Sequence, residues 1–300
     1  AMSAVLVDNG IDKGAIWHFG EVAKEQRALA DGKAWADLSH RTVIEVAGED
    51  RLSWLHSLTT QHLEKLEPGK WIDALILDPQ GHIEQQFILV DDGKASYLVL
   101  DSQLAPALIN HLEKMRFMLR VSVRDASDDY GILKAPGKSD LLGGPYALVP
   151  RAEIENMKSL FDSNAIQVGI WALEAERIAA GRPRIGLDMD HKSIPNELGL
   201  LNKSVHMNKG CYRGQETVAK VFNLGRPPRR LVLLHLDGSN VELPPTGAVV
   251  MNGETEVGFI GSVGRHYELG PIALALIKRS TPTDATLIAA GVSASQEVIS

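Results

Sequence analysis

The sequence has a single cysteine and no long apolar run. One cysteine among 300 residues excludes an internal disulfide framework and cannot supply the four thiolates that usually hold an iron–sulfur cluster. No apolar run approaches the length of a membrane span, and the N-terminus lacks the basic-then-apolar pattern of a signal peptide. We therefore expect a cytoplasmic protein with no membrane partner and no cluster held by this chain alone.

Basic residues are also too few to form a nucleic-acid surface from bulk charge. The chain has 38 acidic and 31 basic residues and a net charge of -7, so we expect no direct nucleic-acid partner. It has no phosphate loop, no dinucleotide fingerprint and no His-Glu-x-x-His motif. The ten histidines are scattered without the spacing of a metal motif, and the sequence therefore predicts no metal site.

The patterns that are present predict an α+β protein. A length of 300 residues with 44% hydrophobic content is enough for two or three domains. An alternating strand pattern over 42–48 precedes Asp50 at the N-cap position of a predicted helix. Apolar runs at 71–77 and 83–90, joined by a Pro-Gln-Gly turn, indicate a hairpin. Hairpins interleaved with helices favour an α+β fold over a doubly wound parallel sheet.

The C-terminal part of the chain reads as a separate all-β domain. A Gly-Arg-Pro-Pro linker at 225–228 precedes it, and Asn252-Gly253 is a strong hairpin turn. Short strands separated by regular turns predict a small β-barrel or sandwich. The expected strands are 231–236, 248–251, 257–263 and 272–277.

The lone cysteine, Cys211, lies in a stretch with unusual local chemistry. Lys209 and Arg213 flank it, and the apolar pattern that starts at Val218 predicts a helix just after it. Cations and the free N–H groups of a helix start both favour a thiolate. This pattern makes Cys211 a candidate reactive thiol, although a lone cysteine can equally be a small buried apolar residue.

The same stretch carries a family resemblance. Lys209-Gly210-Cys211-Tyr212-Arg213-Gly214-Gln215-Glu216 resembles the signature of the YgfZ family, which are folate-binding proteins related to the T-protein, or aminomethyltransferase, of the glycine cleavage system. Further similar segments occur along most of the chain. They are 37–40, 48–50, 177–183, 194–200 and 273–277.

The resemblance implies a fold, a ligand and partners. The family fold is a ring-like arrangement of three domains around a central hole that holds tetrahydrofolate. On this sequence it places a folate-binding domain at 2–50 plus 126–224, a second α+β domain at 51–125 and a C-terminal β-barrel at 225–300. The implied partners are iron–sulfur assembly proteins or client iron–sulfur enzymes, including enzymes that modify tRNA.

Matching the T-protein site to this chain keeps some of its residues and replaces others. Glu197 matches a carboxylate that reads the pterin edge, which suits an acceptor of two N–H bonds. Arg230 matches an arginine that opens the last domain and faces the folate. Gln85 and Gln86 stand where the acidic pair of a transferase is expected, and a neutral amide cannot act as a general base. Ala179 replaces a further carboxylate.

Three more side chains of the signature complete the expected site. Lys209 and Arg213 would pair with the carboxylates of the folate tail or with a phosphate of a partner. Gln215 begins the predicted helix, where a polar side chain either contacts folate or caps the helix. The resemblance thus places folate near Glu197, Arg230, Lys209, Gln215 and Gln86, with Cys211 as the functional thiol.

Three functions remain open at this stage. The first is a tetrahydrofolate-binding protein that assists iron–sulfur cluster assembly or repair, in which Cys211 performs transient thiol chemistry or shares a cluster with a partner. The second is a folate-dependent aminomethyl or methyl transferase, which Gln85 and Gln86 disfavour. The third is a scaffold whose folate cavity is vestigial.

Overall fold

The computed structural model of the chain describes residues 3–239 and 241–299. The chain forms two compact units, each assembled from segments that are distant in sequence. Unit 1 comprises Ala1–Ile76, Gln85–Ile170 and Ser204–Arg213, and unit 2 comprises Leu77–Glu84, Trp171–Lys203 and Gly214–Ser300. Among the described residues, no helix is both long and apolar enough to cross a membrane. The three-domain boundaries and the ring-like arrangement stay predictions.

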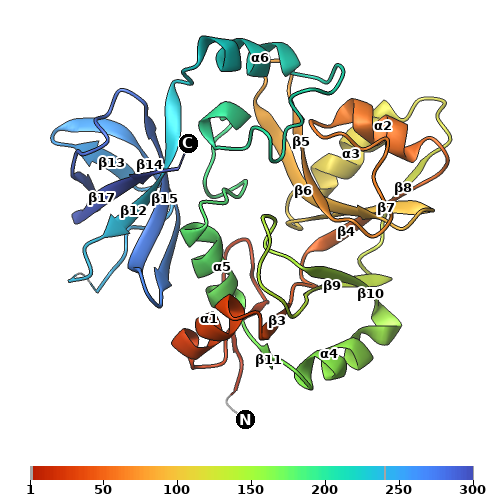
Figure 1. Cartoon of the computed structure of the whole chain (residues 1–300), viewed down its shortest axis with the longest axis horizontal. Coiled ribbons are helices and arrows are strands. Elements are labelled where there is room, and N and C mark those ends of the chain that lie inside the picture. The colour runs from red at the N-terminus through yellow and green to blue at the C-terminus, as the bar shows by residue number, and fades with distance from the viewer. Residues whose placement is uncertain (1–2, 240, 300) are drawn as a thin grey trace. The chain divides into compact units, whose positions relative to one another are not determined.

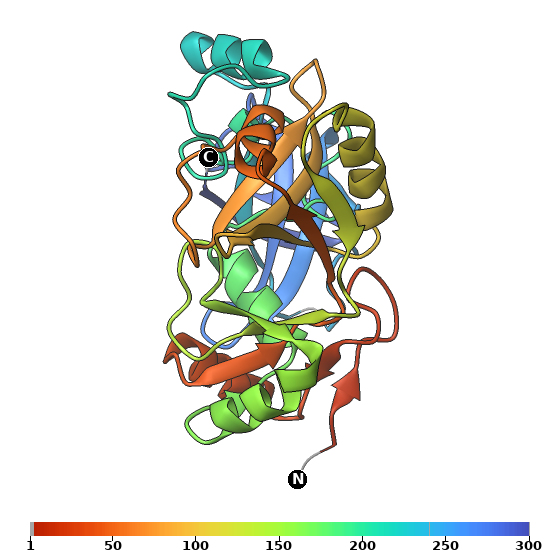
Figure 2. The ribbon, with the colours of Figure 1, turned by 90° about the vertical axis from the view of Figure 1, so that its right-hand side faces the viewer.

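The larger sheet of unit 1 has five strands in the order β5-β6-β7-β4-β8 (Figure 1). The strands are β4 (Thr42–Ala47), β5 (Ile72–Leu77), β6 (Ile83–Asp91), β7 (Ala95–Leu100) and β8 (Ser122–Asp125). The helices α2 (Arg51–Leu58) and α3 (Ala105–Met115) cover one face of this sheet (Figure 2). Leu55 of α2 and Leu108 of α3 are fully buried in the core beneath them. Burying apolar surface on one face of a sheet is the main stabilising contribution in such a layer.

A second, smaller sheet of unit 1 has the order β10-β9-β3-β11. Its strands are β3 (Ala34–Asp37), β9 (Tyr130–Lys134), β10 (Tyr146–Pro150) and β11 (Ile166–Gln167), and the flanking elements are β1 (Val5–Leu6), β2 (Ile16–His18), α1 (Val22–Ala30), η1 (Arg151–Glu153) and α4 (Ile154–Asp162). Trp35 and Leu133 are buried in its core. The glycine- and proline-rich segment 137–150, whose composition predicts a connection, ends in β10, which pairs with β9 over five residues.

Unit 2 contains a closed barrel of six strands in the order β12-β15-β14-β13-β16-β17. The barrel strands are β12 (Arg229–Leu236), β13 (Val249–Asn252), β14 (Thr255–His266), β15 (Gly270–Lys278), β16 (Leu287–Ala289) and β17 (Val292–Val298), and the other elements of the unit are α5 (Ile170–Ala179), η2 (Pro195–Glu197) and α6 (Gln215–Leu224). Small and branched apolar side chains such as Val232 and Ala275 fill its interior. The predicted α+β class and the C-terminal barrel are confirmed.

Candidate functional site

The signature stretch begins with Lys209, a buried lysine of unit 1. Its side chain is 6% exposed, and its ammonium donates to the carbonyl oxygens of Thr59 at 2.7 Å and Gln61 at 3.0 Å, and also to that of His56. An ammonium has three protons to donate, so these carbonyls use all of them. Burial lowers the pKa of Lys209 to about 8, and the nearby Glu64 acts in the opposite direction.

This position for Lys209 alters two expectations from the sequence. The ammonium binds the end of α2 and the turn after it, so pairing with a folate carboxylate would break one of these bonds. The ammonium is also committed to these carbonyls rather than offered to the neighbouring thiol. Lys209 is therefore first of all a structural residue that holds the signature stretch to α2.

Side chains alternate between buried and exposed along the next residues. Tyr212 is buried, and its ring lies 5.5 Å from the Lys209 ammonium, a cation–π distance. Burial raises the pKa of Tyr212 to about 12. Cys211, between these two buried side chains, is exposed and is a free thiol. The stretch thus presents one thiol to solvent, and the interpretation of Cys211 as a buried apolar residue is wrong.

Two glycines fix the start of the signature helix within unit 2. Gly214 is the N-cap of α6 and has a φ of 83°, a conformation that glycine adopts without steric cost. A Cβ at Gly214 would lie 2.6 Å from the carbonyl oxygen of Asp78, and one at Gly81 would lie 2.8 Å from Thr217. The helix start and the 78–81 turn therefore pack backbone against backbone. Gln215 is the first residue of α6, as the sequence predicted for a helix after Cys211.

Glu197 in unit 2 is buried and paired. It is 1% exposed, and its carboxylate accepts from Nε and Nη2 of Arg229, each at 2.9 Å, and from the backbone N–H of Ile194 at 3.2 Å. Arg229 also donates to Asp190 at 2.7 Å. Burial acts to raise the pKa of Asp190, but bonds from Arg229 and Ser193 outweigh it and lower the pKa to about 2.

The arginine that meets Glu197 is Arg229, and its neighbour Arg230, which the family resemblance places facing the folate, makes other contacts. Successive residues of a strand point to opposite faces, and Arg230 is buried, where it donates to the carbonyls of Arg279 and Thr281, each at 2.7 Å. The Nε of Arg230 is buried without a hydrogen-bond partner. Sequence alternation separates the two arginines but does not tell which one faces the carboxylates.

Within the described parts of the chain, two buried amide oxygens next to expected folate residues have no hydrogen-bond partner. Gln85 on β6 is buried, and its Oε1 has no hydrogen bond. Asn196, next to Glu197, donates from Nδ2 to the carbonyl of Val218 at 3.1 Å, while its Oδ1 is buried and unpaired. A buried acceptor without a partner costs free energy, and ligand or water commonly satisfies it. Gln86 follows Gln85 on β6 and is half-buried.

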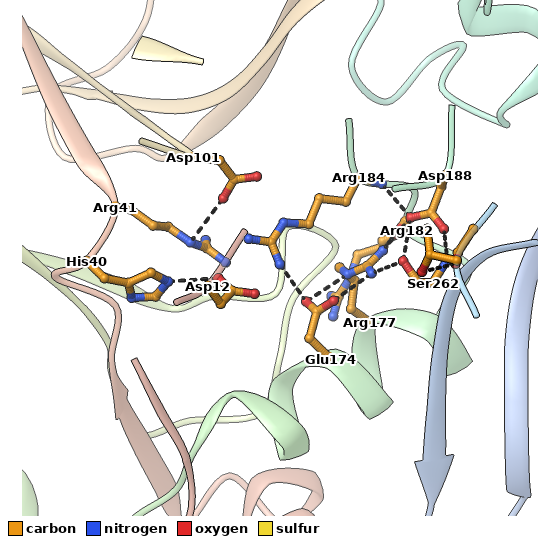
Figure 3. Close-up of polar contacts among 12 residues, drawn as sticks. Asp12, His40, Arg41, Asp101, Glu174, Arg177, Arg182, Arg184, Asp188 and Ser262 are labelled. Carbon is orange, nitrogen blue, oxygen red and sulfur yellow. Dashed lines mark hydrogen bonds and ion pairs between the residues drawn. The ribbon is translucent and has the colours of Figure 1, made fainter. Parts of the chain in front are cut away.

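A buried ion-pair network that the sequence did not single out ties α5 to the barrel within unit 2 (Figure 3). Arg177 donates to Glu174 at 2.7 Å and to Asp188 at 2.9 Å. Asp188 also accepts from the hydroxyl of Ser262 on β14 at 2.9 Å. Burial acts against the charge on Arg177, but Glu174 and Asp188 outweigh it and raise its pKa. Ala179, at the end of α5, has no group that could join this network.

The chain is similar to known proteins in both sequence and fold. Residues 4–139 match the family model of the GCVT N-terminal domain. The crystal structure of the glycine cleavage system aminomethyltransferase T from Bartonella henselae superimposes with a TM-score of 0.82 at 18% identity, covering 100% of this chain and 94% of that chain. This likeness establishes the fold.

Proteins of three kinds are among the sequence relatives. An aminomethyltransferase of Nostoc is 24% identical over 86% of this chain and 80% of its own length. An iron–sulfur cluster assembly factor IBA57 homologue of Mycosarcoma maydis, a mitochondrial protein, is 25% identical over 72% of this chain and 61% of its length. A tRNA-modifying protein YgfZ of Colwellia psychrerythraea is 22% identical over 69% of this chain and 72% of its length. The chain thus contains a match to the GCVT N-terminal domain and is similar both to aminomethyltransferases and to proteins of the YgfZ and IBA57 type.

Proposed function

We propose that the chain binds tetrahydrofolate and supports the assembly or repair of iron–sulfur clusters, with Cys211 as its functional thiol. Two relatives support the second part, since their names describe an iron–sulfur cluster assembly factor and a tRNA-modifying protein. Enzymes that modify tRNA by cluster chemistry would be clients of such a factor. Iron–sulfur assembly proteins or these client enzymes are the proposed partners.

The observation that carries the proposal is the exposure of Cys211 two residues after an anchored lysine. Lys209 binds three carbonyls of unit 1, the unit that also contains Cys211. A free thiol next to an anchored residue can approach a partner without first ordering a loop. One thiol cannot hold a cluster, so Cys211 acts in transient thiol chemistry or as one ligand beside those of a partner.

Tetrahydrofolate suits the donors and acceptors that the chain leaves open. The amino-pyrimidine edge of a pterin carries N–H donors, and the amide oxygen of Asn196, which has no partner among the described residues, is an acceptor. Glu197, the next residue in unit 2, contributes negative charge, although Arg229 already occupies both of its oxygens. We therefore propose Asn196 as a folate contact in addition to Glu197, and we retain Gln86 and Gln215 as proposals from the family resemblance.

Transfer of a one-carbon unit is the weaker alternative for this chain. A transferase needs a carboxylate to take up a proton or to stabilise a developing cation, whereas Gln85 and Gln86 are neutral at every physiological pH. Gln85 is moreover buried and its amide oxygen has no partner. We expect no folate-dependent turnover of methylamine-type donors, and turnover with any donor of a panel would favour the transferase.

The two parts of the proposal are tested separately. Calorimetry with tetrahydrofolate tests folate binding, and rescue of a strain that lacks the gene for this protein tests the role in iron–sulfur cluster assembly or repair. We expect saturable folate binding by the chain, with weaker binding by Asn196→Ala and unchanged binding by Cys211→Ala. Cys211→Ala should fail to restore iron–sulfur enzyme activity while folding as the parent does. Full rescue by Cys211→Ala would refute the thiol role. Absence of folate binding with intact rescue would leave a scaffold with a vestigial cavity.

A further inference from the structure

Three histidines and a glutamate gather beside the signature stretch in unit 1. His56 is in the last turn of α2, His62 and Glu64 follow in the loop after it, and His206 lies just before the signature. One ligand atom from each of His56, His62 and Glu64 lies within 4.8 Å of the others. The ring of His62 also lies beside that of His206. The sequence predicted no metal site because these residues come from two segments that are far apart along the chain.

The spacing of the rings suits coordination of a single ion. Zn²⁺ binds imidazole nitrogen at about 2.0–2.1 Å in tetrahedral geometry. Two such imidazoles have ring centroids about 5 Å apart, because each centroid lies about 1 Å beyond its ligating nitrogen. The centroids of His56 and His62 are 4.7 Å apart, and those of His62 and His206 are 5.3 Å apart. Both distances fit two rings on one ion.

The ring nitrogens of this cluster are only partly used by the fold. Over residues 3–239 and 241–299, Nδ1 of His206 is buried without a hydrogen-bond partner. Nδ1 of His56 accepts from the backbone N–H of Leu63 at 3.1 Å, which places the proton of the neutral ring on Nε2. Burial, followed by the charge of Lys209, lowers the pKa of His56. The cluster thus contains an imidazole nitrogen that the fold itself does not satisfy.

We propose that His56, His62 and Glu64 bind one divalent transition metal ion of the Zn²⁺, Co²⁺ and Fe²⁺ class, with His206 as a fourth ligand. Imidazole and carboxylate together suit these ions. Nε2 of His56 becomes a ligand only in the other tautomer, which loses the Leu63 bond. His206 lies outside the group of ligand atoms that are within 4.8 Å of one another, although its ring is next to that of His62. His62 is therefore the central ligand of the four.

One charge near the cluster opposes binding of a cation and another favours it. Lys209 places a buried ammonium next to His56 and repels a cation, and Glu64 supplies the compensating negative charge. Because Lys209 bonds to the carbonyl of His56, an ion here would further fix α2 to the segment that precedes Cys211. This proposal does not depend on folate binding or on the thiol role.

Titration of the metal-free full chain with Co²⁺ tests the site, with the visible d–d absorption of the bound ion as the readout and Zn²⁺ as competitor. We expect one Co²⁺ per chain, displaced by Zn²⁺. His62→Ala should weaken binding at least about tenfold, and His56→Ala, Glu64→Gln and His206→Ala should each weaken it less. His191→Ala is the matched control, since His191 is an exposed histidine of unit 2, and it should bind as the parent does.

Folding of the variants is checked by circular dichroism and thermal melting without metal. Should an alanine variant fail to fold, His206→Gln and His62→Gln keep the volume and remove the ligand. No saturable Co²⁺ binding by the parent chain would refute the site. Equal binding by the parent and by a folded His62→Gln/His206→Gln double variant would also refute it, because the ion would then lie elsewhere.

Discussion

Replacing Lys209 with methionine tests the main structural claim about the signature stretch. Methionine keeps an unbranched apolar side chain of similar length and removes the ammonium. The carbonyl oxygens of His56, Thr59 and Gln61 would then each lose a bond to a charged donor. Bonds to charged groups contribute about 1.5–3 kcal/mol each to stability, so the three losses together amount to about 5–9 kcal/mol.

The substitution also removes an unfavourable contribution. Burial lowers the pKa of Lys209 from its ordinary 10.5 to about 8, which corresponds to about 3 kcal/mol of cost for keeping the ammonium buried. The carbonyl of His56 is partly buried and water can replace some of its bonding. We therefore expect Lys209→Met to lower the free energy of unfolding by about 2–4 kcal/mol.

The stability difference between the parent chain and Lys209→Met should depend on pH. Between pH 8 and about 10.4 the unfolded chain keeps the proton of Lys209 that the folded chain has lost, so the stability of the parent relative to Lys209→Met should rise with pH. Below pH 8 both states carry the proton and the difference should be constant. A difference that falls across pH 8–10 would mean that the carbonyls hold the proton more strongly than burial repels it.

Urea unfolding followed by tryptophan fluorescence measures the change, since Trp54 lies on α2. A shift of the midpoint with an unchanged slope reports stability rather than altered compactness. Lys65→Met is the matched control, because Lys65 is an exposed lysine of the loop that follows α2, and it should change stability by less than about 0.5 kcal/mol. A destabilisation below about 0.5 kcal/mol for Lys209→Met would refute the structural role and leave only a chemical one.

Three further predictions concern the same regions. Arg229→Gln should destabilise the chain by about 3–5 kcal/mol near neutral pH, as measured by urea unfolding. This loss of stability should become smaller as the pH falls from about 3.8 through 2, because Asp190 of the parent takes up its proton in that range. Gly214→Ala should raise hydrogen exchange in α6 and cost more than about 2 kcal/mol, whereas Gly69→Ala, also at positive φ but in open space, should cost about 1 kcal/mol. Cys211 should react with a thiol reagent in the folded chain at a rate that denaturant raises less than tenfold; a thiol that reacts only after unfolding would contradict its exposure.

Local patterns predicted the elements whose signals are local. The hairpin predicted at 71–77 and 83–90 corresponds to the neighbouring strands β5 and β6, because turn residues and apolar runs lie within one short window. The strands β9 and β10 were missed, since their partners are set by sheet pairing and burial rather than by composition. Asp50 is the N-cap residue of α2, but its side chain bonds to Arg120 instead of capping the helix.

The sequence proposes the residues of the candidate site but not their contacts. The signature residues and Glu197 were chosen because their pattern resembles that of a family. The carbonyl partners of Lys209 and the pairing of Glu197 with Arg229 depend on contacts between distant segments, which no periodicity encodes. The histidine cluster is the clearest example, since His206 joins His62 only when the chain is folded.

The bond between Lys209 and α2 has a consequence for how the protein is made. Lys209 and His56 are 153 positions apart in the chain. During translation, α2 therefore emerges from the ribosome long before Lys209, which binds the carbonyls at the end of α2, has been synthesised. Contacts of such long sequence separation form late and slow folding. The nascent N-terminal unit therefore remains incomplete until residues 204–213 have emerged, and the exposed thiol of Cys211 emerges in the same segment that completes it.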